Sequence, residues 1–335
     1  MPTDWPSLHG SHFATTRALV TGGAGFIGSH LCEALLGLGA RVVILDDLSG
    51  SDRSNIDALE ANAGGRLQFK EGSILDSQLV QRCAAGCDVV FHHAALASVP
   101  RSVAEPRLFH DVNCTGTLNV LEGARHSGVR RVVFAASSSA YGDSEELPKV
   151  ETMAPLPKSP YAANKLAGEA LMRAYAGSFG LDTASLRYFN IFGPRQNANS
   201  AYAAVIAAFA KALLADTAPV IFGDGQQSRD FTFVENAVHA NLLAARKKDP
   251  IEGEVFNIAC GQRVSVNDLA SLMAEMLDRP HLEARHEPAR AGDVLHSLAD
   301  LSRARAVLGY EPIVPFRQGL ESTVHWYRGA LDKQR

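Results

Sequence analysis

The chain has 335 residues, of which 46% are hydrophobic and 20% charged, as expected of a globular protein with room for roughly two domains. Its formal net charge of −4, without a long basic run, gives no electrostatic case for binding nucleic acid or an anionic membrane. No apolar run approaches the length that a bilayer requires, and residues 1–15 lack the apolar core of a signal peptide. Five scattered cysteines without metal-ligand spacing fit a reducing compartment, so we expect a cytoplasmic protein.

Short apolar runs alternate with helical patterns from residue 16 to about residue 190. The predicted strands are Ala18–Thr21, Val42–Leu45, Leu67–Lys70, Val89–His92, Val132–Ala135 and Thr183–Tyr188. Strands separated by helices indicate a parallel sheet with right-handed crossovers, and its ligands bind at the carboxyl ends of the strands. We therefore predict an α/β protein. Residues 1–15 are an N-terminal extension, and residues 16–193 form a Rossmann-type, doubly wound domain.

The pattern changes after residue 193. A helix is expected over 202–214, strands over 220–223 and 253–258, and a second helix from an N-cap at Ser265 to about Leu277. Four prolines punctuate the rest. Residues 194–335 are therefore expected to form mainly a smaller substrate lobe, with some segments returning to the Rossmann domain.

A glycine turn follows the first strand. Gly22 permits a tight turn, Gly25 lets the backbone approach a pyrophosphate, and Gly28 lets the helix pack close to the strand. The helix that begins here offers unpaired N–H groups to the phosphates. Asp46, 18 residues after Gly28, ends the second strand, where a carboxylate binds the hydroxyls of an adenosine ribose and repels a 2′-phosphate. The turn predicts a dinucleotide site that favours NAD, although the nearby Arg53 keeps NADP open.

Tyr161 and Lys165 are four residues apart, so on a helix they share one face. We expect the ammonium to lower the pKa of the phenol and so to make it a general base. A glycine turn and a tuned acid–base pair together predict hydride chemistry at an alcohol carbon.

Three serines, Ser137, Ser138 and Ser139, follow the fifth strand. Because buried hydroxyls need hydrogen-bond partners, three at a ligand-facing edge predict a substrate site. Ser137 is the hydroxyl expected to hold a reacting sugar oxygen while Tyr161 exchanges its proton.

Other polar residues are predicted to reach the same cleft. Asn190 and Gln196 follow the sixth strand, while Arg229 and Arg290 are candidate phosphate clamps because a guanidinium makes two parallel bonds to phosphate. A surface ion pair is the alternative for either arginine. No metal site is predicted, because the adjacent His92 and His93 point to opposite faces of their strand.

With these motifs, the chain resembles the extended short-chain dehydrogenase/reductase family, and within it the bacterial UDP-N-acetylglucosamine 4-epimerases. The resemblance runs from Val20 to about Tyr310 and is most specific around Ala135–Asp143, Ser159–Lys165 and Leu186–Gln196. It implies NAD as cofactor. It also implies an isomerase that oxidises C4 of a UDP-sugar to a ketone and returns the hydride to the other face.

The resemblance implies roles for individual residues. The implied catalytic residues are Ser137, Tyr161 and Lys165, and the implied cofactor residues are Gly22, Gly25, Phe26, Ile27, Gly28, Asp46, Ser73, Ile74, Tyr161 and Lys165. The implied substrate residues are Ser98, Ser138, Ser139, Asn190, Gln196, Ala204, Val205, Phe222, Arg229, Arg290, Asp293 and Ser297. Ser73 departs from the family pattern, which has an aspartate touching adenine. The family also implies a homodimer joined by a four-helix bundle of helices around 103–126 and 160–179.

Ser297 bears on the choice of sugar. Members restricted to plain hexoses carry a tyrosine there, and a serine leaves room for an N-acetyl group. The alternative is that Ser297 caps a helix beginning near Leu298.

Other activities on this scaffold remain alternatives. UDP-glucose or UDP-glucuronate 4-epimerisation needs the same residues, and a non-catalytic NAD(H)-sensing regulator is more distant because this chain keeps the tyrosine and the lysine. A 4,6-dehydratase would have Asp-Glu where Ser138 and Ser139 stand. A decarboxylase would have an arginine where Ser297 stands.

Overall fold

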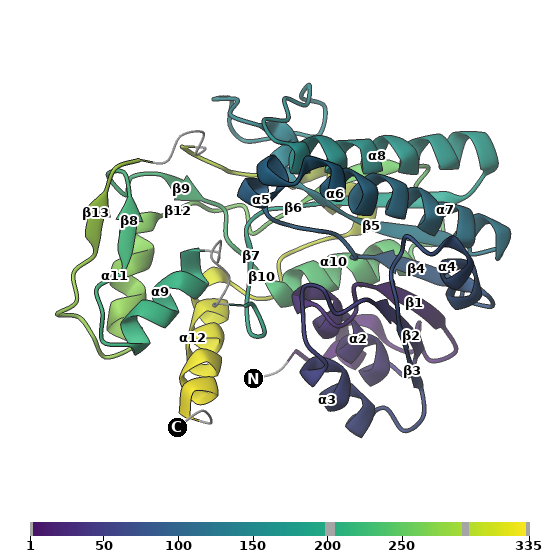
Figure 1. Ribbon diagram of the computed structural model, residues 1–335, viewed down its shortest axis with the longest axis horizontal. Coiled ribbons are helices and arrows are strands. Elements are labelled where there is room, and N and C mark those ends of the chain that lie inside the picture. Colours follow the sequence, from purple (N-terminus) through teal and green to yellow (C-terminus); the bar gives the residue numbers. More distant parts are fainter. Residues whose placement is uncertain (1–2, 198–204, 290–294, 333–335) are drawn as a thin grey trace.

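A seven-stranded, entirely parallel sheet forms the centre of the protein in the computed structural model, which describes residues 3–197, 205–289 and 295–332 (Figure 1). The strand order is β11-β6-β5-β4-β1-β2-β3. The strands are β1 (Arg17–Thr21), β2 (Arg41–Asp46), β3 (Leu67–Glu71), β4 (Val89–His92), β5 (Arg131–Ser137), β6 (Asp182–Tyr188) and β11 (Glu254–Ile258). All six strands predicted before residue 193 are present, and the fold is the predicted Rossmann-type α/β fold.

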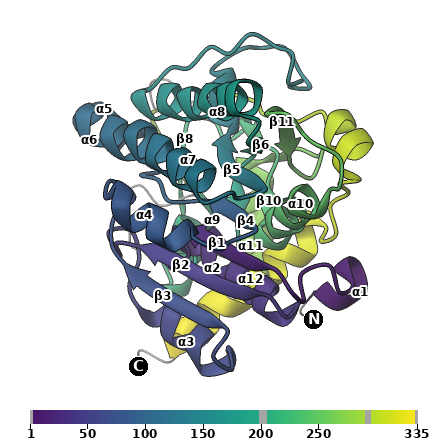
Figure 2. The same ribbon diagram turned by 90° about the vertical axis from the view of Figure 1, so that its right-hand side faces the viewer.

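Helices cover both faces of this sheet, which explains the nearly continuous apolar runs of its strands. The helices of this part are α2 (Phe26–Gly37), α3 (Ser54–Asn62), α4 (Ser77–Ala84), α5 (Val99–Ala104), α6 (Pro106–His110), α7 (Gly116–His126), α8 (Pro160–Phe179) and α10 (Val234–Arg246), with a π-helical turn η1 (Asp111–Thr115) and a 3-10 turn η2 (Ser138–Tyr141). In Figure 2, α4, α7 and α8 lie on one side of the strands and α2, α3 and α10 on the other. Alternate strand residues face the two layers: Val133 and Ala135 pack towards α10, whereas Phe134 and Ala136 pack towards α8.

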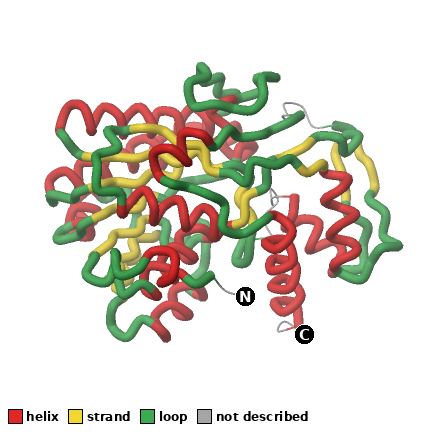
Figure 3. Tube along the Cα trace, turned by 180° about the vertical axis from the view of Figure 1, so that it is seen from behind, coloured by secondary structure: helices red, strands yellow, loops and turns green. Residues whose placement is uncertain are grey.

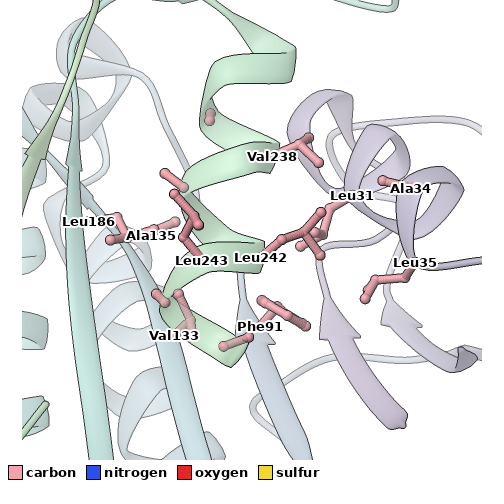
Figure 4. Close-up of a cluster of buried hydrophobic side chains, with 14 of the residues drawn as sticks. Leu31, Ala34, Leu35, Phe91, Val133, Ala135, Leu186, Val238, Leu242 and Leu243 are labelled. Carbon is pink, nitrogen blue, oxygen red and sulfur yellow. The ribbon is translucent and has the colours of Figure 1, made fainter. Parts of the chain in front are cut away.

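The helix α10 and the strand β11 come from the C-terminal half of the chain and complete this sheet. Figure 4 shows Val238, Leu242 and Leu243 of α10 against Leu31 of α2 and the strand residues Phe91 and Val133. β11 pairs with β6 along its whole length, from Glu254 opposite Ala184 to Ile258 opposite Tyr188. Two segments beyond residue 193, α10 and β11, thus lie in the main sheet and its helical layer.

The second part of the molecule is built from short strand pairs and helices around its own apolar core. It contains β7 (Ile191–Phe192), α9 (Val205–Leu214), β8 (Val220–Phe222), β9 (Ser228–Arg229), β10 (Thr232–Phe233), β12 (Val264–Ser265), α11 (Val266–Met276), β13 (Arg285–Glu287) and α12 (Phe316–Asp332). The π-helical turn η3 (Ala304–Leu308) packs instead on the core of the large sheet, through Ala304 and Leu308. The strands pair as β7 with β10, β8 with β13 and β9 with β12. Figure 3, seen from behind, shows α9, α11 and α12 as a group to one side of the large sheet. Ser265 caps α11 through a hydrogen bond from Asp268 N–H at 3.0 Å, as predicted.

The N-terminal extension packs on the outside of α2 and α10. Its short helix α1 (Trp5–His9) buries His9, whose Nε2 lies 3.0 Å from Nδ1 of His239 on α10. Phe13 is also buried, and the carbonyl of Leu8 accepts a hydrogen bond from Arg246. The extension is thus an integral part of the helical layer.

None of the helices in the described ranges is long and apolar enough to cross a membrane. All five cysteines are free, and Cys32 on α2 and Cys114 on η1 are buried, as their apolar neighbours predict.

Candidate functional site

The glycine turn lies where the strand order of the sheet reverses. β1 pairs with β2 on one side and with β4 on the other, so the crossovers diverge and leave a crevice beyond the carboxyl ends of β1 and β4. Gly22 adopts φ +73°, and a Cβ there would lie 2.5 Å from the backbone nitrogen of Ala94. A Cβ on Gly28 would lie 2.1 Å from the carbonyl oxygen of Gly22. Both positions therefore exclude any side chain, which keeps α2 close to β1.

The residues of this turn fit a dinucleotide. Gly25 is the N-cap of α2, and no side chain bonds to that cap, so the first N–H groups of the helix face the crevice. Asp46 lies at the end of β2, with 9% of its surface exposed. Its Oδ2 accepts from Ala24 N–H at 3.0 Å and its Oδ1 from Leu48 N–H at 2.9 Å, while burial raises the pKa of this carboxyl. Asp46 therefore also fastens the glycine turn, which the sequence did not indicate.

The residues predicted to bind adenine lie at the end of β3. The hydroxyl of Ser73 accepts a hydrogen bond from Leu75 N–H at 3.3 Å. Ile74 is buried against Gly116, and its carbonyl accepts from the side chain of Asn119 at 3.0 Å. Ser73 is half-buried, and the bond from Leu75 N–H shows that its hydroxyl stabilises the loop.

The predicted acid–base pair lies on α8. Ser159 caps this helix, Tyr161 lies in its first turn, and Lys165 is buried one turn later. Lys165 Nζ donates to the carbonyl of Ala135 on β5 at 2.8 Å and lies 4.9 Å from the ring centre of Phe134. Burial lowers the pKa of Lys165 to about 8, while Glu169 and Cys114 raise it. An ammonium whose pKa lies this close to neutral pH is suited to a proton-transfer site.

The prediction that Lys165 lowers the pKa of Tyr161 is wrong for this structure. Burial raises the pKa of Tyr161, and the opposing effect comes from the hydroxyl of Ser137. The physical reason is that the described hydrogen bond of the ammonium goes to a backbone carbonyl, while the phenol is desolvated. Tyr161 and Ser137 are nonetheless brought together, as predicted.

The three serines end β5 beside this pair. Ser137 accepts hydrogen bonds from the backbone N–H of Ser139 at 3.2 Å and from its hydroxyl at 2.9 Å. All three serines are half-buried, and η2 starts at Ser138. His92 and His93, at the end of β4, point to opposite faces, as expected: His92 lies between Thr21 and Thr117, and His93 stacks on Tyr188.

A cavity of about 300 Å³ opens in the second part of the molecule, and Asn190, just after β6, contributes to its lining. Four of its lining residues were predicted from the sequence: Asn190, Val205, Phe222 and Arg229. The apolar wall was not predicted, because its members come together only through tertiary packing: Ile191, Phe192, Ile206, Phe209, Val220, Ile221, Phe231 and Val266. An apolar pocket with a few polar groups is typical of a small-molecule site.

Asn190 and Ser297 meet at the edge of this cavity. Asn190 has φ +38°, and its amide donates to Ser297 Oγ at 3.3 Å and to the carbonyl of Asp230 at 3.2 Å. The hydroxyl of Ser297 also accepts from Asp230 N–H at 3.3 Å. No helix begins at Leu298 in the described chain, so the helix-cap alternative for Ser297 is wrong.

Asp230 is a functional residue that the sequence reasoning missed. It is fully buried, and its carboxylate accepts from the N–H groups of Cys260, Gly261 and Ala299 at 3.0 to 3.2 Å. Burial raises its pKa to about 6. In the sequence, only the position of Asp230 next to Arg229 could have indicated this role. The carboxylate joins its own segment to two others that are distant in sequence, at residues 260–261 and at residue 299.

The other predicted residues have different positions. Gln196 donates to the carbonyl of Ile191 at 3.1 Å, and its own carbonyl accepts from Tyr327. Ser98 caps α5 through Arg101 N–H at 3.3 Å. Ala204, Arg290 and Asp293 lie outside the described residues.

The fold and the crevice define a Rossmann-type protein that carries a dinucleotide beside a tyrosine–serine–lysine site. Comparison with known proteins narrows this class: residues 18–259 match the NAD dependent epimerase/dehydratase family, to which the chain belongs. NAD is its cofactor and isomerisation its reaction class.

Three relatives illustrate the match. The UDP-glucose 4-epimerase of Mycolicibacterium smegmatis is 40% identical over 93% of this chain and 98% of its own. The UDP-N-acetylglucosamine 4-epimerase of Methanobrevibacter ruminantium M1, solved with UDP-N-acetylmuramic acid, is 37% identical, with a TM-score of 0.89 over 94% of this chain and 99% of its own. The UDP-glucuronic acid 4-epimerase of Bacillus cereus, solved with NAD and UDP-4-deoxy-4-fluoro-glucuronic acid, is 32% identical, with a TM-score of 0.87 over 94% of this chain and 99% of its own.

Proposed function

We propose that this protein is a UDP-sugar 4-epimerase that interconverts UDP-N-acetylglucosamine and UDP-N-acetylgalactosamine. The observation that carries the proposal is the convergence of Tyr161, Ser137 and Lys165 at the edge of the sheet beside the glycine turn. The relatives named above support the reaction, because each is named as a 4-epimerase of a UDP-sugar. The small side chain at position 297 supports the acetylated sugar.

In the proposed reaction, the glycine turn would hold NAD, which would supply the acceptor for the C4 hydride and its return. Tyr161 removes the proton from O4, and Ser137 holds that oxygen in line. Because burial raises the pKa of Tyr161 in the protein alone, the proposal requires Lys165, buried one turn along α8, to stabilise the phenolate only once cofactor and substrate are bound. The resulting 4-keto sugar turns over about its bond to the diphosphate and takes the hydride on its other face, and Tyr161 gives the proton back to O4.

The turnover of the keto sugar requires that the nucleotide stay bound while the sugar moves. We assign this to the cavity around Phe222, Val205 and Asn190, which would bind uracil, and to Arg229, which would bind phosphate. Arg290 and Asp293 are proposed to complete this grip, with Ala204, Gln196 and Ser98 at its margins. Ser138 and Ser139 would face the sugar.

Ser297 would set the room around the sugar's C2 substituent. Its hydroxyl is bonded to Asn190 and to the backbone of Asp230, so the side chain lies at the rim of the cavity and does not fill it. A tyrosine at this position would project a ring into that space. The pocket should therefore accept an N-acetyl group and reject plain hexoses only weakly, by about 1–3 kcal/mol per missing contact.

Epimerisation of UDP-glucose or UDP-glucuronate is the second candidate, supported by the printed functions of two relatives. A non-catalytic NAD(H) sensor would not need Tyr161 and Lys165 brought to the same edge. A panel of UDP-N-acetylglucosamine, UDP-glucose and UDP-glucuronate, incubated with purified protein and no added electron acceptor, tests all three. We expect the highest kcat/KM with UDP-N-acetylglucosamine. A higher value on either other sugar would overturn the assignment, and inactivity on all would favour the sensor.

We also propose the domain division into residues 1–15, 16–193 and 194–335, in which α10 and β11 return to the Rossmann domain. We further propose a homodimer formed by the helices of 103–126 and 160–179. These helices run side by side on one face (Figure 2), and Val103 on α5 is 64% exposed, with Val99, Leu108 and Leu118 also exposed. Sedimentation of the wild type and of Val103→Glu tests the dimer: the wild type should sediment as two copies, and the variant as one.

A further inference from the structure

A buried ion pair lies one helical turn below the lysine of the proposed site. Tyr161, Lys165 and Glu169 are each four residues apart on α8, so they share one face of the helix. Glu169 and Arg187 are 5% and 3% exposed. Arg187 donates from Nε and Nη2 to the two carboxylate oxygens of Glu169, at 2.9 and 2.7 Å. Such a two-pronged bond fixes the orientation of both partners.

The pair joins α8 to β6 directly behind the strand end that carries Ser137. Arg187 lies opposite Ala136 in the register of β5 and β6, and its guanidinium stacks on the ring of Tyr141 at 4.6 Å. A second bond, from Thr183 Oγ1 to the carbonyl of Met172 at 2.8 Å, ties the same helix to the same strand farther from the site. Docking of α8 therefore does not depend on the ion pair alone.

Lys165 is buried, so a nearby anion is needed to stabilise its positive charge. Its ammonium is 4% exposed, and its described bond goes to a neutral carbonyl. The other titratable groups facing it are Cys114 from η1 and the imidazoles of His92 and His93 from β4. Burial lowers the pKa of both histidines, so they are neutral near pH 7 and supply no counter-charge. Burial likewise raises the pKa of the Cys114 thiol, so the thiol stays protonated.

Resting on the proposed function, we propose that Glu169, held by Arg187, is a positioning residue that keeps Lys165 charged and aligned below Tyr161. The carboxylate lies on the face of α8 that carries the ammonium, and Arg187 prevents it from turning away. In agreement, Glu169 raises the pKa of Lys165 against the effect of burial. A purely structural pair would leave the titration of Lys165 unchanged.

The test is the pH dependence of kcat of the NAD-loaded enzyme with UDP-N-acetylglucosamine. Activity requires charged Lys165 and so falls as the pH rises through the pKa of Lys165. The double variant Glu169→Gln/Arg187→Met removes both charges, so no buried ion is left unpaired. We expect its alkaline limb to move down by about one pH unit, with KM and NAD content within about twofold of wild type. If the double variant does not fold, Glu169→Asp serves instead, with a smaller downward shift.

Two controls separate the outcomes. Thr183→Val removes the other bond between α8 and β6 without changing charge, so it should lower the melting temperature and leave the alkaline limb in place. Lys165→Met should lose kcat at every pH. An active Lys165→Met enzyme would contradict the proposed function itself. An inactive Lys165→Met together with an unmoved limb in the Glu169 variants would overturn only the inference, leaving the pair as a docking contact.

Discussion

The two halves of the site are held together in different ways. The NAD half is the edge of one sheet: the glycine turn, Asp46 and Ser73 follow β1, β2 and β3, which are hydrogen-bonded neighbours. The sugar–nucleotide half is assembled from short segments far apart in sequence, from Asn190 to Ser297, and the buried carboxylate of Asp230 joins several of them. The first half depends on regular strand pairing, and the second on a few specific side-chain bonds. Changes in one half should therefore leave the other intact.

The largest effect is expected where the halves meet. Tyr161→Phe removes the proposed proton acceptor and almost no volume, so kcat should fall by about 10²- to 10⁴-fold. NAD content and binding of UDP should stay near wild type, because neither half is disturbed. Turnover is measured by chromatography of the two epimers. Near wild-type kcat in this variant would remove Tyr161 from the reaction.

Asp46→Ala tests the NAD half alone. The change removes the proposed ribose ligand and the hydrogen bonds that Asp46 accepts from Ala24 in the glycine turn and from Leu48, so NAD affinity should fall roughly tenfold or more. The difference between the affinities for NAD and NADP should narrow, and the affinity for UDP should not change. Calorimetry on the apoprotein measures the affinity for each of the three ligands. Wild-type protein that binds NADP as well as NAD would refute the role given to Asp46.

Ser297→Tyr tests the sugar–nucleotide half alone. The ring should suppress epimerisation of the acetylated sugars by about tenfold or more in kcat/KM and spare UDP-glucose. Ser297→Ala is the matched control: it loses the bonds to Asn190 and Asp230 but adds no volume, so it should not change the preference. An equal loss on both sugars in Ser297→Tyr would remove the support for the acetylated substrate.

The smallest effect concerns the extension. Burial lowers the pKa of His9 to about 3 and that of His239 to about 4, from 6.5. Between pH 6.5 and the pKa values of the folded state, the unfolded chain therefore binds more protons than the folded one. The stability that the two neutral, buried histidines contribute is complete above about pH 6.5 and is lost as the pH falls towards 4. The melting temperature should drop between about pH 7 and pH 5 by a few degrees more in wild type than in His9→Phe. His12→Gln, which alters an exposed histidine of the same segment, should behave as wild type. Equal slopes in wild type and His9→Phe would refute the contribution.

The sequence predicted the NAD half of the site better than the sugar–nucleotide half. The strands of the sheet and the glycine turn were predictable because each is a local pattern of apolar periodicity or spacing. The apolar wall of the cavity was not, because Phe192, Ile206 and Phe231 come together only through tertiary packing. The pKa of Tyr161 was predicted in the wrong direction, since spacing reveals which groups are near one another and not how far burial desolvates them. Ser297 was placed by resemblance, and its bonds to Asn190 could not be inferred from either segment alone.

The return of α10 and β11 to the main sheet has a consequence for dividing the chain. A fragment ending at residue 193 would leave the edge of β6 unpaired and the apolar residues under α10 uncovered, among them Phe91 and Val133. An open edge beside a bare apolar face is a template for aggregation. The segment 194–233 is thus an excursion between β6 and α10, not a tail after a finished domain. We therefore expect limited proteolysis to yield no stable N-terminal fragment. Exchange of the second part between relatives should require at least three junctions, near residues 193, 233 and 258, because β12, α11 and α12 follow β11.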